Sequence, residues 1–367
     1  MKNTIVIDAR TLGGTGLGRY VSDLLENFAS IDHEFRFRVL CPNPEKMIEL
    51  HDGKFEFIRA AAPLYSVKEQ WEVARLAKGS DLLHCPHYNV PFCYKGRLVV
   101  TIHDLTHITY REFLPNRFAY YYAQFMLRVA ARHARQIITD SQFSKRAICS
   151  HLDIREEKVH AILLALSESF SHSLMTSSVQ PPKHGINRPY ILYVGLLKPH
   201  KNVDGLIRAF SLLPGGLRDR HQLVVAGKLD RSYPALRQLA EDLRLRDQVL
   251  FTGHLSDGDL YALYAGARVF VLPSLNEGFG LPALEAMAYG IPVVASNTSS
   301  LPEVVGKAGI LVNPRNTQEI ASAITRFLTD ECLRSQSIEL GLRRVQLFSA
   351  KDFAIRHLEV YREALAA

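Results

Sequence analysis

Two glutamates with seven residues between them frame the stretch of the chain that is richest in chemistry. Glu277 and Glu285 bracket a glycine loop made of Gly278, Phe279, Gly280 and Leu281. Pro282 fits the first position of a helix, where a missing backbone N–H costs nothing. Backbone N–H groups at a helix N-terminus favour an anion such as phosphate, and glycine lets a ligand come close. Carboxylates are strong acceptors for hydroxyl groups. The stretch therefore predicts binding of a ligand that carries hydroxyl groups on both sides of a phosphate. A nucleoside diphosphate sugar is such a ligand.

A second string, GLLKPHKN, follows the predicted strand 190–194 and contains Lys198 and Lys201. An ammonium group at a strand end, beside the start of a helix, is a natural partner for phosphate. The alternative is a solvated surface lysine.

The elements that must position these residues are short apolar runs separated by helical segments. The predicted strands are residues 4–9, 35–40, 55–58, 81–84, 98–102, 136–139, 190–194, 222–226, 248–252, 268–272, 291–295 and 309–312. Alternation of strand and helix predicts parallel sheets covered by helices on both faces. In such sheets ligands gather at the carboxyl ends of the strands.

His103 falls at such an end, directly after the strand 98–102. Its imidazole can donate to a sugar oxygen or a phosphate, and the neighbouring carboxylate of Asp104 could orient the ring. The alternative is a histidine satisfied within the core.

The first predicted strand leads into a loop of glycines that includes Gly16, followed by a helical run over 19–28. This order suits close approach of a phosphate. Arg19 stands where a dinucleotide fingerprint would need its third glycine, which disfavours a dehydrogenase. A tight turn alone remains the other interpretation.

Length and composition agree with a two-domain globular enzyme. The chain has 367 residues, of which 47% are hydrophobic and 22% charged, and its net charge is +7. No apolar run approaches the roughly 20 residues that span a bilayer, and the start lacks a signal-peptide layout, so we expect a cytoplasmic protein. The five cysteines contain no C-x-x-C pair, which indicates neither a zinc site nor a disulfide framework.

The string EGFGLPALEAMAYGIPVVAS, with Glu277 and Glu285, resembles the E-x7-E signature of retaining glycosyltransferases of family 4. The resemblance implies the α/β GT-B fold, in which two doubly wound Rossmann-like domains face each other across a cleft. It places an acceptor-side domain at 1–175, a linker at 176–188 and a nucleotide-sugar domain at 189–349. A C-terminal helix, 350–367, should return to the first domain.

The resemblance also gives roles to single residues. Glu277 would hold the donor sugar and Glu285 the ribose hydroxyls, while Lys201 would bind the diphosphate. Gly16 would face the diphosphate and His103 the donor sugar and acceptor. The nucleobase would lie against His254 and Leu255. Many members carry an arginine where this chain has Leu196, and we hypothesise that Lys198 or Lys228 substitutes for it.

Family 4 enzymes need no metal, and the sequence offers two weak signals against that expectation. Asp257-Gly258-Asp259 matches a D-x-D motif, but Ser256 three residues before Asp259 reads better as a capped helix start. His84, His87 and His107 could suggest a metal cluster, yet no matching carboxylates can be identified. We expect no metal and no other cofactor.

The segment 111–146 carries seven lysines and arginines against two acids, interleaved with aromatic residues. It could meet an anionic membrane or a lipid-diphosphate acceptor, or be a packed helix with a solvated basic face. The sequence leaves both open. No recognition module for nucleic acid accompanies the charge.

The predicted activity is metal-independent transfer of a hexose with retention of configuration, from a nucleotide sugar to a glycan or lipid-linked acceptor. UDP-glucose is the first choice of donor and GDP-mannose the second. A nucleotide-sugar epimerase and a non-catalytic sugar-nucleotide binding protein are the alternatives.

Overall fold

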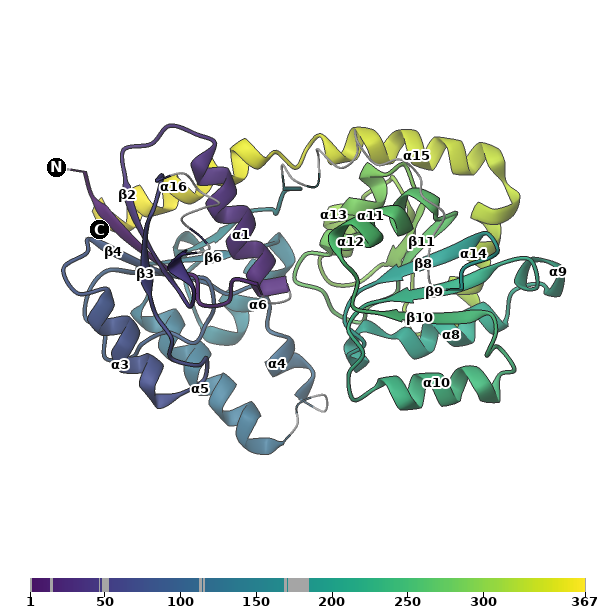
Figure 1. Ribbon diagram of the computed structural model, residues 1–367, viewed down its shortest axis with the longest axis horizontal. Coiled ribbons are helices and arrows are strands. Elements are labelled where there is room, and N and C mark those ends of the chain that lie inside the picture. Colours follow the sequence, from purple (N-terminus) through teal and green to yellow (C-terminus); the bar gives the residue numbers. More distant parts are fainter. Residues whose placement is uncertain are drawn as a thin grey trace. The chain divides into compact units, whose positions relative to one another are not determined.

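The computed structural model describes residues 2–13, 16–45, 47, 53–111, 114, 116–167, 170 and 185–366. The chain divides into two compact units (Figure 1). Unit 1 comprises residues 1–168 and 349–367, and unit 2 comprises residues 169–348. Of the linker predicted at 176–188, residues 176–184 lie outside the described residues.

Unit 1 contains a seven-stranded sheet in the order β3-β2-β1-β4-β5-β6-β7, and every pair is parallel. Its strands are β1 (Thr4–Asp8), β2 (Arg36–Cys41), β3 (Glu56–Arg59), β4 (Leu82–Cys85), β5 (Leu98–Thr101), β6 (Gln136–Thr139) and β7 (Val159–Ala161). Its helices are α1 (Gly16–Ala29), α3 (Val67–Leu76), α4 (Thr106–Thr109), α5 (Arg117–His133), α6 (Gln142–Leu152), the 3-10 turn η2 (Glu156–Lys158) and α16 (Ala350–Ala366).

Unit 2 contains a six-stranded parallel sheet in the order β10-β9-β8-β11-β12-β13. Its strands are β8 (Tyr190–Val194), β9 (Gln222–Ala226), β10 (Val249–Gly253), β11 (Val269–Leu272), β12 (Val293–Ser296) and β13 (Ile310–Val312). Its helices are η3 (Pro199–Lys201), α8 (Val203–Ser211), α9 (Gly215–Arg218), α10 (Tyr233–Asp242), α11 (Asp257–Gly266), α12 (Leu281–Ala288), α13 (Leu301–Val305), α14 (Thr317–Thr329) and α15 (Glu331–Val345). This strand order is that of the Rossmann fold.

All twelve strands predicted from the sequence are present, with ends within two residues. β7 is an additional strand that the sequence did not predict. Helix α12 begins at Leu281, so Pro282 takes its second position rather than the first. Ser256 caps α11 by accepting from the N–H of Asp259, which confirms the capped helix start.

Helices cover both faces of the sheet in unit 1, because successive strand residues point to opposite sides. Ile5 and Ile7 of β1 belong to one buried cluster, with α1 and α16. Val6, between them, belongs to a second cluster, with α3 and α5. The doubly wound architecture expected from the sequence is therefore confirmed.

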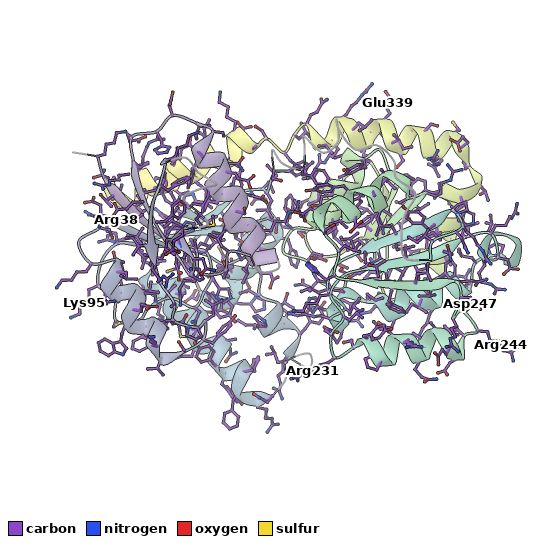
Figure 2. The ribbon with its side chains drawn as sticks, viewed as in Figure 1. Arg38, Lys95, Arg231, Arg244, Asp247 and Glu339 are labelled. Carbon is purple, nitrogen blue, oxygen red and sulfur yellow. The ribbon has the colours of Figure 1, made fainter. Side chains whose placement is uncertain are left out.

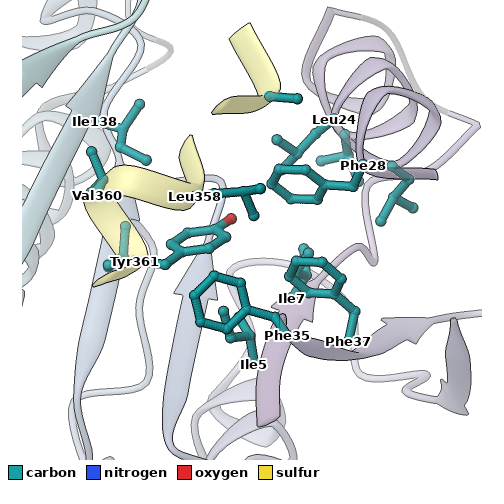
Figure 3. Close-up of a cluster of buried hydrophobic side chains, with 14 of the residues drawn as sticks. Ile5, Ile7, Leu24, Phe28, Phe35, Phe37, Ile138, Leu358, Val360 and Tyr361 are labelled. Carbon is teal, nitrogen blue, oxygen red and sulfur yellow. The ribbon is translucent and has the colours of Figure 1, made fainter. Parts of the chain in front are cut away.

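The C-terminal helix α16 is part of the core of unit 1, as predicted. Tyr361 and Leu358 pack in the same buried cluster as Phe28 and Phe37 of α1 and β2 (Figure 3). Ile355, on the same helix, is only half-buried. Charged side chains such as Glu339 on α15 project from the surface (Figure 2). In the described part of the chain, no helix combines the length and apolar character needed to span a bilayer.

Candidate active site

The predicted donor-binding residues of unit 2 follow the carboxyl ends of neighbouring strands. Lys198 and Lys201 follow β8, Lys228 follows β9, His254 and Leu255 follow β10, and the loop from Glu277 to Leu281 follows β11. Because all these strands are parallel, the residues lie along one edge of the sheet. β8 and β11 flank the point where the strand order reverses, which is where such sheets bind ligands.

Two glycines fix the close approach of the loops after β8 and β9. A Cβ on Gly227 would lie 1.9 Å from the carbonyl oxygen of Gly195. Gly227 also has φ of +154°, so a side chain there would meet both a steric and a conformational barrier. No pattern in the sequence singled out Gly227. Lys228, the residue that follows, is exposed, as is Lys198.

Lys201 and Glu277 form an ion pair across the switch point. Lys201 Nζ donates to Glu277 Oε2 at 2.7 Å, and the side chains are 18% and 11% exposed. The Oγ of Ser274 donates to the other carboxylate oxygen of Glu277 at 2.8 Å. The two residues assigned to diphosphate and sugar therefore lie in direct contact with each other.

Asn202 ties together the loops that carry this pair. Its backbone is left-handed, with φ of 57°, a conformation that asparagine tolerates better than most residues. Its Nδ2 donates to the carbonyl oxygens of Pro273, at 3.0 Å, and Pro314, at 2.7 Å. The loops after β8, β11 and β13 are thereby held in one arrangement. Asn202 had no role among the sequence predictions, although its position after the lysine string and before a helix was a usable signal.

The glycine loop between the two glutamates opens α12 as predicted. Gly280 is the residue before the helix and has φ of +103°. A Cβ there would lie 2.4 Å from Leu301 Cδ2, so both conformation and space call for glycine. The buried Ser300 Oγ lies 2.9 Å from the carbonyl oxygen of Glu277 and 2.8 Å from that of Phe279, which fixes the loop from the α13 side.

Glu285 is 1% exposed, in the second turn of α12. Tyr264 Oη donates to its Oε2 at 2.6 Å. Tyr264 in turn stacks on Tyr289, with ring centroids 5.6 Å apart and planes at 12°. The structure thus supplies a hydrogen-bonded, aromatic setting for this carboxylate, and its role toward a ribose stays a prediction.

In unit 1, His103 is held by two acceptors. Its Nδ1 donates to Asp140 Oδ2 at 2.7 Å and its Nε2 donates to the Pro86 carbonyl oxygen at 3.1 Å. Burial lowers the pKa of His103, but the charge and hydrogen bond of Asp140 and the Pro86 carbonyl outweigh it, so the pKa is raised above 6.5. Both partners are acceptors, so this arrangement favours the doubly protonated imidazole over a free base.

The orienting carboxylate is therefore Asp140, and the expectation that Asp104 fills this role is wrong. Asp104 Oδ1 instead accepts from the backbone N–H of Thr106, at the start of α4. Asp140 follows β6, whose neighbour β5 leads into His103. The contact joins the carboxyl ends of two adjacent strands, 37 residues apart in the chain, which explains why the sequence did not reveal it.

The first glycine loop is only partly described, since Gly14 and Thr15 lie outside the described residues. Gly16 is the first residue of α1 and is exposed, and a Cβ added there would meet no atom within 4 Å. The glycine that packing requires is Gly18, where a Cβ would lie 2.4 Å from the Thr11 carbonyl oxygen. The role of Gly16 toward a diphosphate stays a prediction.

A chain of buried hydrogen bonds links the neighbourhood of His103 to α16. Tyr361 Oη donates to His84 Nδ1 at 2.7 Å, and His84 Nε2 donates to Thr101 Oγ1 at 2.9 Å. Thr101 Oγ1 donates to Tyr20 Oη at 3.1 Å, and Tyr20 donates to His357 Nε2 at 2.8 Å. A final bond, in which His357 Nδ1 donates to a backbone carbonyl at 2.7 Å, leaves His357 Nε2 as an acceptor. Tyr20 must therefore donate to it, and this fixes the direction of each earlier bond in turn.

This chain of hydrogen bonds holds neutral histidines and lies against the ring of His103. Burial lowers the pKa of His84 well below 6.5 and that of His357 to about 4, so both are neutral at pH 7. The Tyr20 ring meets the His103 ring edge-on, with centroids 4.7 Å apart. His84 is thus committed to Thr101 and Tyr361, and no group of three or more His, Cys, Asp or Glu side chains in the described ranges is arranged to hold a metal.

Comparison with known proteins places this geometry in a family. The family model described as "Glycosyl transferases group 1" matches residues 177–343, and the model described as "Glycosyltransferase Family 4" matches residues 14–165. The O-antigen chain mannosyltransferase B of Escherichia coli is 30% identical, over 95% of this chain and 96% of that protein. The chain belongs to the group 1 glycosyltransferases. The family recognised from the E-x7-E string is thereby confirmed.

A further relative of this glycosyltransferase is the serotype-specific mannosyltransferase WbdA of Escherichia coli. It is 35% identical over 90% of this chain, but the match spans only 41% of WbdA. Solved structures confirm the GT-B fold. Sucrose-phosphate synthase from Thermosynechococcus elongatus superposes with a TM-score of 0.79 at 22% identity, covering 99% of both chains. HepE of Anabaena, solved with UDP-glucose, gives 0.75 at 21% identity, covering 98% of this chain and 99% of that one.

Proposed function

We propose that this glycosyltransferase moves mannose from GDP-mannose to a glycan or lipid-linked acceptor, with retention of configuration and without a metal ion. Two relatives, at 30% and 35% identity, are mannosyltransferases. The KPHKN string also resembles polysaccharide mannosyltransferases. These observations move GDP-mannose ahead of UDP-glucose, which becomes the second candidate donor.

The observation that carries the proposal is the Lys201–Glu277 pair at the switch point of unit 2. An ammonium group for a diphosphate and a carboxylate for sugar hydroxyls lie 2.7 Å apart, which suits the two halves of one nucleotide sugar. The loop that opens α12 adds backbone N–H groups to the same strand edge. Lys198 and Lys228 are both exposed beside it and can supplement the positive charge.

Transfer would proceed on one face of the sugar. The bond from the anomeric carbon to the diphosphate oxygen breaks, the acceptor oxygen bonds to that carbon, and the acceptor proton passes to the departing phosphate. Glu277 is poorly suited to act as a nucleophile, because its two oxygens accept from Lys201 and Ser274. Lys201 would stabilise the leaving diphosphate, and removal of such a contact commonly lowers the rate by about 100-fold or more.

Positive charge at His103 would serve the acceptor half of the reaction. The pKa of His103 is raised by Asp140 and the Pro86 carbonyl, against the effect of burial. A cationic imidazole can neutralise a phosphate on a lipid-diphosphate acceptor, whereas donation to a sugar oxygen would require Nε2 to leave the Pro86 carbonyl. We place the enzyme in the cytoplasm, with peripheral contact to the inner face of a membrane through residues 111–146.

The test is to incubate the purified protein with GDP-mannose, UDP-glucose and ADP-glucose, and to follow nucleoside diphosphate release with and without a lipid-linked glycan acceptor. We expect GDP release that depends on the acceptor, with an α-linked product. Free mannose or an epimer formed without acceptor would point to an epimerase. Tight binding without turnover on any acceptor would point to a non-catalytic binding protein. Either result would overturn the proposal.

A further inference from the structure

The exposed aromatic side chains of the described residues are confined to one stretch of unit 1. They share more than a third of their surface with solvent and come from α3, α5 and the loops beside them: Tyr65, Trp71, Phe92, Phe118, Tyr121, Tyr122 and Phe125. We call this set the aromatic face. The other large apolar side chains exposed in the described ranges are Val67, beside Trp71 on α3, and four leucines of unit 2. A monomer rarely gathers exposed aromatic residues in this way without a use for them.

Helix α5 has two apolar stripes on opposite sides. Its inner stripe, which includes Met126 and Leu127, packs in the buried cluster under α3 and α5. Its outer stripe, at spacings of three and four residues, is the run of aromatics from Phe118, which is 85% exposed, to Phe125, which is 59% exposed. None of the aromatic residues that the structure describes in the segment 111–146 is buried, and this removes the main support for its interpretation as an ordinary packed helix.

Helix α3 extends the same face. Trp71 is 65% exposed on its outer side. The Tyr65 ring, just before α3, contacts the Tyr122 ring of α5, with centroids 6.2 Å apart. Phe92 donates its backbone N–H to Gln70 Oε1 of α3 at 3.0 Å. These contacts link the loop after β4 to α3 and the residue before α3 to α5, and Figure 1 shows α3 and α5 at the same end of unit 1.

The fully exposed charged side chains of α3 and α5 are all basic. Exposed basic residues flank it on both helices: Lys68, Arg75, Arg117, Arg128 and Arg132. Helix α5 has no acidic residue. The two acids of α3 are engaged elsewhere, since Glu69 is buried against Arg10 and Glu72 accepts from a backbone N–H. Aromatic rings with lysine and arginine around them are the composition that settles at the headgroup level of a bilayer.

We propose that the aromatic face docks unit 1 on an anionic lipid bilayer. The rings of Trp71, Phe118 and Phe125 enter the interface, and the basic residues bind lipid headgroups of negative charge. A second copy of the chain is disfavoured as the occupant, because two such faces would bring like charges together. The inference extends the proposed function by placing a lipid-linked acceptor and the enzyme on one surface, but it rests on the face alone.

The chain carries its own probe for this docking, because Trp71 is the single tryptophan in the sequence. Vesicles of phosphatidylglycerol should shift its fluorescence to shorter wavelength and shield it from acrylamide, and brominated acyl chains should quench it. Pure phosphatidylcholine should do so weakly. Raising the salt from 0.05 to 0.5 M, as rough limits, should release the protein, since the attraction of exposed charges is screened.

Paired substitutions separate the two parts of the proposal. Phe118→Ser with Phe125→Ser should weaken vesicle binding by about 10-fold or more, through lost apolar burial. Arg128→Gln with Arg132→Gln should weaken it by about 25-fold, at about five-fold per charge. The control, Leu342→Ser with Leu347→Ser, alters exposed apolar residues of unit 2 and should leave binding unchanged.

Circular dichroism and thermal unfolding serve as the folding check for every variant, and nucleotide binding is measured separately, so failure of the docking and failure of the glycosyltransferase proposal remain distinguishable. An unchanged Trp71 spectrum on phosphatidylglycerol vesicles would overturn the inference. So would equal binding of the Phe118, Phe125 variant and the native chain. If sedimentation showed self-association without lipid, and acrylamide quenching showed Trp71 shielded in that associated state, the face would be assigned to a second copy instead.

Discussion

The contact between Lys201 and Glu277 predicts opposite effects of their removal on binding of a nucleoside diphosphate. The two side chains satisfy each other, at 2.7 Å and with 18% and 11% of their surfaces exposed. A diphosphate that binds Lys201 must compete with the Glu277 carboxylate and is repelled by it. Lys201→Met should therefore weaken GDP binding, whereas Glu277→Gln should strengthen it.

The magnitudes follow from the chemistry of the pair. A hydrogen bond to a charged group contributes about 1.5–3 kcal/mol, so Lys201→Met should weaken GDP binding by about 10- to 150-fold. A carboxylate about 6 Å from a phosphate charge repels it by about 0.7–3 kcal/mol for dielectric constants of about 80 down to 20. Glu277→Gln should therefore tighten GDP binding by about 3- to 100-fold. Glutamine keeps an oxygen for the Ser274 hydroxyl, so the loop should hold its shape.

The assay is calorimetric titration of each variant with GDP and with GDP-mannose at one ionic strength. Lys201→Met should lower both affinities by the same factor. Glu277→Gln should tighten GDP binding more than GDP-mannose binding, because the sugar loses its hydroxyl acceptor. Glu339→Gln, an exposed residue on α15, controls for the change in net charge. If Glu277→Gln weakened GDP binding as much as Lys201→Met does, the competition inferred from the ion pair would be wrong.

Three further predictions address the supporting residues. Lys198→Ala and Lys228→Ala should each lower turnover by several-fold, about 1 kcal/mol per exposed charge; unaltered rates in both would end the hypothesis that they replace the family arginine. Gly18→Ala should lower the free energy of unfolding by about 1–3 kcal/mol, because its Cβ meets the Thr11 carbonyl, whereas Gly16→Ala should be neutral in a denaturant titration. In the unfolded chain His357 binds a proton below pH 6.5, whereas in the folded protein its pKa of about 4 keeps it neutral, so His357 alone should contribute a loss of about 3 kcal/mol of stability between pH 6.5 and 4. A His357→Gln variant with the same pH slope as the native chain would contradict this.

The sequence predicted most of the fold because parallel strands are short, apolar and regularly interrupted. β7 was not predicted, because its three residues, VHA, give no periodic signal. The glycine loop and the two glutamates were found because their spacing is local to one loop and helix. Capping at Ser256 was found for the same reason.

The contacts between site residues could not be predicted from the sequence, because they join residues far apart in the chain. Lys201 and Glu277 are 76 residues apart, and sequence patterns assigned a ligand to each but did not pair them with each other. Asp104 was preferred to Asp140 as the partner of His103 because adjacency in sequence is visible and adjacency of strand ends is not. The sequence likewise could not show that the aromatic residues of α5 face solvent, because a helical spacing fits a buried or an exposed stripe equally well.

The central claim is that unit 2 grips an activated sugar by its diphosphate at the strand edge that carries Lys201 and the loop before α12. A crystal structure of the protein soaked with GDP-mannose tests this most directly. We expect the diphosphate within hydrogen-bond distance of Lys201 Nζ and of backbone N–H groups between Gly278 and Leu281, with the mannose hydroxyls on Glu277. Density for the nucleotide sugar away from this edge, with the Lys201–Glu277 contact unchanged, would contradict the account.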